Sequence, residues 1–125
     1  MATGGRKSQL QCIHQISILL GPNTPVAGNI GVLPAGALLL TAHLSVGTVF
    51  NSTTNTVSAG IGAGGTQLLN AISLTAAART DTPAPVANQG PLTADTPITY
   101  TLASTGAAPT QGAAVLAVDY IAAVG

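Results

Sequence analysis

A stretch of alternating side chains between residues 37 and 50 limits the fold more than any other feature of this sequence. Apolar side chains recur at every second position, which places on one face Leu38, Leu40, Ala42, Leu44, Val46 and Phe50. The opposite face carries Thr41, His43, Ser45 and Gly47. Because a helix turns by about 100° per residue, this pattern would scatter the leucines around its whole surface. The stretch therefore predicts a long β-strand with one buried face.

The same alternation predicts further strands, separated by Gly, Pro, Asn and Thr. In residues 9–20, one face holds Leu10, Cys12, His14, Ile16, Ile18 and Leu20. Shorter strands are expected over residues 26–33, 56–62, 97–104 and 113–124. In the last of these, the apolar face holds Leu116, Val118, Tyr120, Ala122 and Val124. We expect strand 56–62 to form a hairpin with the central strand, and the last two strands to form another.

Two segments have no clear period. Residues 66–78 combine helical and alternating spacing, which predicts a short helical turn running into a strand. Residues 79–94 contain three prolines and predict the longest irregular segment. The total of about seven or eight strands predicts an all-β protein with an antiparallel β-sandwich. We expect residues 1–8 to form a flexible N-terminal arm and residues 9–125 to form one domain.

Charged residues are unusually rare in this chain. They make up 5 % of the sequence and the formal net charge is zero, whereas a typical soluble domain carries about 25 % charged residues. Burying Thr, Ala and Gly at an interface avoids the desolvation cost of charges and the entropy cost of ordering long side chains. The composition therefore favours a subunit of an assembly. No apolar run reaches the roughly 18 residues of a membrane span, so no membrane partner is expected.

The residues that could carry chemistry are few and scattered. Gly60, Gly62 and Gly65 match a dinucleotide-binding spacing, but the approach to Asp81 lacks the hydrophobic strand such a site needs, so a glycine turn is expected. His14 and His43 lack a third metal ligand. We expect His14 to be a partly buried core or interface residue and His43 to lie on a polar face. Asp119 is expected opposite the apolar row, where it can face water or a partner.

Catalysis is not expected from these residues. Cys12 is interpreted as a small buried hydrophobic residue, because its neighbour His14 has no orienting third group. The aspartates are dispersed and the chain has no glutamate, so no pair of carboxylates is expected. We therefore predict no enzyme activity, no cofactor and no metal. Arg6 and Lys7 neutralise too few phosphates for nucleic-acid binding, and we expect them to contact neighbouring subunits, with a disordered arm as the alternative.

The order of several short segments resembles a known class of proteins. These segments are Leu33-Pro34-Ala35-Gly36-Ala37, Val49-Phe50-Asn51-Ser52, residues 92–100, Thr105-Gly106, residues 109–115 and Val118-Asp119-Tyr120-Ile121. In this succession the chain is similar to small virion proteins of tailed bacteriophages, and in particular to the cement or decoration proteins of their capsids. The resemblance covers roughly residues 33–122, and it implies a jelly-roll fold.

The resemblance also implies a function. Such a subunit would bind the outside of the capsid, bridge neighbouring capsomers and stabilise them. Its partners would be the major capsid protein and further copies of itself in a homodimer or homotrimer, and it would be made in the host bacterial cytoplasm. The alternative is a fibre, spike or tail-adaptor domain that binds the host or joins tail components. With Tyr100 and Tyr120 as the available tyrosines, aromatic platforms for a glycan are few.

Overall fold

The described part of this chain forms eight strands joined by turns, as the alternating pattern predicts. The structure is a computed structural model that describes residues 13–85, 88 and 91–122. The strands are β1 (Ile13–Leu20), β2 (Ala27–Leu33), β3 (Leu38–Thr48), β4 (Thr54–Ile61), β5 (Leu69–Ser73), β6 (Ala78–Pro83), β7 (Thr96–Thr105) and β8 (Ala113–Ile121). The expected arm and the domain boundary at residue 9 lie outside the described residues.

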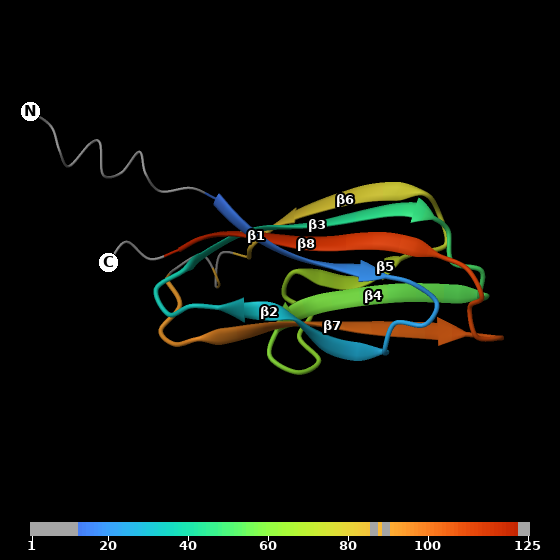
Figure 1. The fold of residues 1–125 in the computed structure, drawn as a ribbon, viewed down its shortest axis with the longest axis horizontal. Helices are drawn as coiled ribbons and strands as arrows, with labels where there is room; N and C mark the ends of the chain where they lie inside the picture. Colours follow the sequence, from blue (N-terminus) through green and yellow to red (C-terminus); the bar gives the residue numbers. More distant parts are fainter. Residues whose placement is uncertain (1–12, 86–87, 89–90, 123–125) are drawn as a thin grey trace, which may run out of the picture.

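The strands form two four-stranded sheets that pack face to face (Figure 1). The first sheet has the order β1-β8-β3-β6, and the second has the order β2-β7-β4-β5. All neighbouring strands are antiparallel. Two sheets of four strands with this order form a jelly roll. The prediction of an all-β, antiparallel, jelly-roll-like sandwich with seven or eight strands is confirmed.

Both predicted hairpins are wrong. β3 belongs to the first sheet and β4 to the second, and β7 and β8 are divided in the same way. Among the eight described strands, β4 and β5 are the consecutive pair that stays in one sheet. The reason is that each strand has one apolar face, and a connection that crosses between sheets brings two such faces together. Alternation shows which face of a strand is buried but does not show which strand lies beside it.

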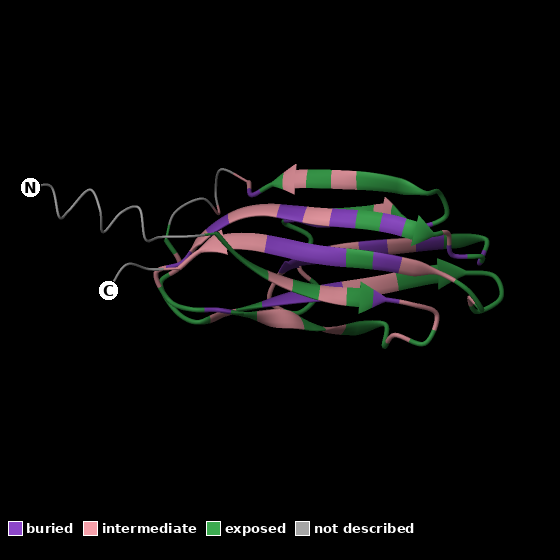
Figure 2. Ribbon diagram, turned by 45° about the horizontal axis from the view of Figure 1, so that its top comes forward, coloured by how far each residue is buried: buried purple, intermediate pink, exposed green. Residues whose placement is uncertain are grey.

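The core lies between the two sheets, and buried and exposed residues alternate along the strands that enclose it (Figure 2). In β3 the alternation differs from the prediction at one point. Leu39 is buried and Leu40 is half-buried, although the pattern places Leu40 on the inner face with Leu38. Leu39 pairs with Tyr120 and Thr41 with Asp119, so Leu40 is an extra residue. Such a β-bulge shifts the alternation by one position.

Further along these strands the predicted faces are confirmed. Ala42, Leu44 and Val46 are buried in β3, and Leu116 and Val118 are buried in β8. In β1, Ile16 and Ile18 pack against the core and Leu20 is fully buried. Cys12 and the start of the predicted first strand lie outside the described residues.

The two segments without a clear period are strands in part. Residues 69–73 form β5, so the predicted helical turn in residues 66–78 is wrong. The predicted irregular segment begins with β6, which pairs with β3 from Ala78 to Pro83. β6 is an edge strand in which no residue is fully buried, so it carries no apolar period. Its backbone hydrogen bonds to β3, and not burial of its side chains, make it a strand.

Candidate interaction surface

The outward-facing side of the first sheet carries most of the charged residues that the structure describes. The hydrogen-bonded register brings them together from β3, β6 and β8, and places the neutral Gln15 of β1 beside them. Gln15 of β1 lies opposite Asp119 of β8, and His43 of β3 lies opposite Asp81 of β6. Arg79 is two residues before Asp81, so both point to the same side of the sheet. Because β8 lies between β1 and β3, the sheet order places Asp119 within reach of both Gln15 and His43.

These five residues form a continuous chain of hydrogen bonds, which we call the His43 network. Gln15 Nε2 donates to Asp119 Oδ1 over 2.8 Å, and His43 Nε2 lies 2.7 Å from Asp119 Oδ2. On the other side, His43 Nδ1 lies 2.6 Å from Asp81 Oδ1. Arg79 Nε donates to both oxygens of Asp81 at 3.2 Å. The network thus connects all four strands of the first sheet.

The network shifts the pKa values of its members in opposite directions. The hydrogen bond to Asp81, and then the bond to Asp119, raise the pKa of His43 above 6.5. The hydrogen bond from His43 is the main cause that lowers the pKa of Asp81. For Asp119, desolvation raises the pKa, but the bonds from Gln15 and His43 and the His43 charge together outweigh it and lower the pKa.

This arrangement leaves His43 without chemistry to perform. When both ring nitrogens donate to carboxylates, the imidazole is protonated and has no lone pair for a metal or for a substrate proton. Among the described residues, no three His, Cys, Asp or Glu side chains are arranged so that they could hold a metal ion. When His43 is protonated, its positive charge and that of Arg79 offset the two negative charges of Asp81 and Asp119. The surface is polar but electrically balanced.

The sequence did not predict this network. His43 lies on the polar side of its strand as expected, and Asp119 lies opposite the apolar row of β8. The expectation of dispersed aspartates is wrong, because Asp81 and Asp119 bind the same imidazole. Asp81 falls within residues 79–94, which the sequence predicts to be irregular, so its position on a strand beside His43 is not predicted. A signal was nonetheless present, since Arg79 and Asp81 are spaced as residues on one face of a strand.

Aliphatic side chains lie on the same outer face. Leu19 and Val115 are direct cross-strand partners of β1 and β8, and they are 68 % and 45 % exposed. We call them the Leu19–Val115 pair. Val115 also lines a shallow depression together with members of the His43 network. The residues that line this depression are Gln15, His43, Ser45, Arg79, Val115, Ala117 and Asp119. An exposed cross-strand aliphatic pair beside balanced charges is suited to contact with another protein.

The other residues singled out in the sequence have structural roles or are not described. His14 is exposed and stacks on Tyr120 with ring centroids 5.4 Å apart, so the expectation that it is partly buried is wrong. The expected glycine turn is formed by residues 62–65, in which Gly65 N donates to Gly62 O, whereas Gly60 lies within β4. A Cβ atom on Gly60 would lie 2.6 Å from the Gly65 carbonyl carbon, so glycine is required there. Arg6 and Lys7 lie outside the described residues.

In the part of the chain that the structure describes, no helix is long and apolar enough to cross a membrane. No family model matches the sequence. No curated protein matches it at a significant level.

The fold is similar to those of chains in three phage capsid structures. A chain of the cyanophage Pam1 capsid asymmetric unit matches with a TM-score of 0.66 and 17 % identity, over 90 % of this chain and 86 % of that chain. A chain of the acidic stable capsid structure of Helicobacter pylori bacteriophage KHP30 matches with a TM-score of 0.62 and 19 % identity, over 87 % of this chain and 86 % of that chain. A chain of the capsid of Ralstonia phage GP4 matches with a TM-score of 0.59 and 20 % identity, over 92 % of this chain and 86 % of that chain. At the level of the fold, the predicted resemblance to phage capsid proteins is confirmed.

Proposed function

We propose that this chain is a structural protein of a phage virion that binds the outside of the capsid as a cement or decoration subunit. The observation that carries the proposal is the jelly-roll match to three phage capsid structures over most of both chains. A subunit of this kind bridges neighbouring capsomers and stabilises the shell because it binds the assembled state alone. Its work consists of contacts, so it needs neither a catalytic residue nor a cofactor.

The outer face of the first sheet is the contact surface in this proposal. Its charges are already neutralised within the His43 network, so covering the face requires no counter-charge from the capsid. Covering an unpaired charge costs several kcal/mol, whereas covering the Leu19–Val115 pair is favourable by about 25 cal/mol per Å² of apolar area. Each contact of this size is weak, and many copies on one shell would add their effects.

Self-association as a homodimer or homotrimer belongs to the same proposal. Four strands, β1, β6, β2 and β5, lie at the edges of the sheets, where backbone groups are open to pairing. A symmetric assembly would cover such edges. The predicted contacts of Arg6 and Lys7 with neighbouring subunits would add to it. The major capsid protein is the other partner, and the protein would be made in the host cytoplasm before it binds the expanded shell.

Co-sedimentation with capsid shells prepared without this chain tests the proposal. We expect binding to expanded shells in preference to procapsids, and equal binding at low and high salt, because the surface carries no net charge. Val115→Asp should weaken binding by at least about tenfold, since it buries an unpaired charge. Val32→Asp is the matched control, because Val32 is a comparably exposed valine, 54 % exposed, on β2 of the other sheet.

Two results would contradict the proposal. Wild-type protein that does not sediment with either kind of shell has no affinity for the capsid. A density map of the particle that places every copy at the tail would instead favour a fibre or adaptor role. If Val32→Asp loses binding while Val115→Asp keeps it, the contact surface is the second sheet and not the first.

A further inference from the structure

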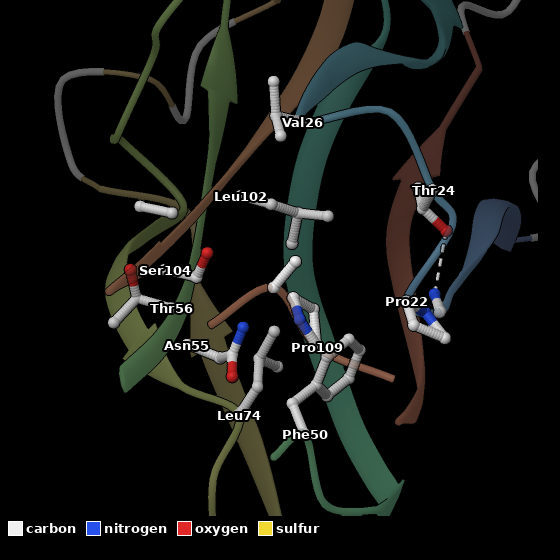
Figure 3. Close-up of a pocket in the computed structure, with 13 residues that line it drawn as sticks. Pro22, Thr24, Val26, Phe50, Asn55, Thr56, Leu74, Leu102, Ser104 and Pro109 are labelled. Carbon is white, nitrogen blue, oxygen red and sulfur yellow. Dashed lines mark hydrogen bonds between the residues drawn. The ribbon is translucent and has the colours of Figure 1, made fainter. Parts of the chain in front are cut away.

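A pocket opens at the end of the sandwich where β1, β3 and β7 finish and β4 and β8 begin (Figure 3). Its volume is about 200 Å³. The walls come from the inner face of the second sheet and from the connections between the sheets. Among its lining residues are Val26, Phe50, Asn55, Leu74 and Leu102 (Figure 3).

The walls of this pocket are mainly aliphatic and aromatic. Phe50 and Leu74 point into it from the connections after β3 and β5, and Leu102 points into it from β7 (Figure 3). None of the residues that line it carries a charge. Transferring a charged ligand into such a site would remove its water without providing a counter-charge. The ligand that fits is therefore neutral.

Asn55 is the exception among the deeply buried wall residues, because it is polar and only 5 % exposed. Its Oδ1 atom accepts a hydrogen bond from Ser52 N over 3.0 Å, which fixes the orientation of the amide. Nδ2 is then directed into the pocket (Figure 3), and no described residue accepts a hydrogen bond from it. An amide nitrogen has two hydrogens to donate. The pocket thus offers one fixed donor to whatever occupies it.

From this combination we infer that the pocket is a binding site for a small neutral molecule with a compact apolar body and one oxygen acceptor, such as a ketone. The oxygen accepts from Asn55 Nδ2, and the body contacts Phe50, Leu74 and Leu102. The size agrees, since an apolar cavity of about 150 Å³ in another protein holds benzene. This pocket therefore accommodates one ring with a short substituent. The inference goes beyond the proposed role on the capsid and does not depend on it.

The donor makes a specific prediction about ligand preference. A ligand that enters the pocket replaces water around Nδ2, and a hydrocarbon cannot restore the lost hydrogen bond. Acetophenone and α-methylstyrene form a matched pair, because they share the ring, the methyl group and a similar size, and differ in having a carbonyl oxygen or a methylene group. We expect acetophenone to bind about threefold to tenfold more tightly.

Methyl NMR titration of the full chain with each probe tests this. The methyl resonances of Val26, Leu74 and Leu102 should shift as the probe is added, and the shifts should reach a plateau when the pocket is saturated. The methyl resonances of Leu39, which is buried at the start of β3, should not shift. Asn55→Asp keeps the oxygen that accepts from Ser52 but removes the donor, so it should abolish the preference for acetophenone. Ala108→Leu adds a side chain to the lining and should prevent binding of both probes.

Some results would overturn the inference. One is the absence of saturable shifts at the pocket methyl groups of the wild-type protein with acetophenone. Another is equal affinity of the wild-type protein for both probes, which would show that Nδ2 does not select the ligand. If Asn55→Asp does not fold, the comparison of the two probes and the Ala108→Leu variant still decide the question.

Discussion

Two neighbouring residues of β8, Val115 and Leu116, provide a direct test of how this sandwich is built and used. Leu116 is fully buried between the sheets, whereas Val115 is 45 % exposed on the outer face. Replacing each in turn with alanine removes apolar carbon atoms from opposite sides of the same strand. The two variants should therefore affect different properties: Leu116→Ala the folding of the chain, and Val115→Ala its association.

The magnitudes follow from the two environments. For Leu116→Ala, the transfer energy lost is about 2.4 kcal/mol, at about 0.8 kcal/mol for each carbon removed. The cavity that remains in a fully buried site raises the total to about 3–5 kcal/mol. For Val115→Ala, two methyl groups that are about half covered contribute less than about 0.9 kcal/mol. The difference is large against a total stability of about 5–15 kcal/mol for a typical domain.

Urea denaturation of the isolated chain, followed by circular dichroism, measures both free energies of unfolding. We expect the midpoint to fall strongly for Leu116→Ala and to change little for Val115→Ala, with similar slopes for both. Co-sedimentation of the folded protein with shells should show the opposite order, with binding weakened more by Val115→Ala than by Leu116→Ala. If Val115→Ala destabilises the chain as much as Leu116→Ala does, the assignment of faces in β8 is incorrect.

Two other predictions concern the His43 network and a glycine beside the core. The folding stability should be greatest between the titration of the two aspartates and that of His43. Because the pKa of His43 is raised, its contribution to stability is complete below pH 6.5 and is lost as the pH rises through the pKa of His43 in the folded protein. Because the pKa values of Asp81 and Asp119 are lowered, their contribution is present above pH 3.8 and is lost as the pH falls through their pKa values in the folded protein. Urea denaturation across this range should show that His43→Gln flattens the alkaline limb, and an unchanged limb would contradict the assignment. Gly112→Ala places a Cβ atom 2.5 Å from Phe50 Cγ and should cost about 1–3 kcal/mol in the same assay. Gly47→Ala, whose Cβ would have Ala113 O at 3.9 Å as its nearest neighbour, is the control and should cost little; equal losses would refute the packing argument.

Most of the strands and their buried faces can be predicted from the order of amino acids. Alternation identifies the buried side chains of residues 42–46 and places Leu116 and Val118 on the inner face of β8, because a pleated strand places every second side chain on the same face. The scarcity of charge is equally a property of the composition, and it is sufficient to favour an assembly. The order of short segments also resembles that of small phage virion proteins, and the similarity to chains of phage capsid structures confirms this at the level of the fold.

Which strands are neighbours could be learned from the three-dimensional arrangement alone. Pairing between β3 and β6 joins residues far apart in the chain, and no local pattern records it. That pairing brings Asp81 to His43, and the insertion of β8 between β1 and β3 brings Asp119 to the other side of the same ring. The pocket around Asn55 likewise exists because separate connections meet at one end of the sandwich. Periodicity constrains each strand separately, whereas a site made by several strands depends on their arrangement in space.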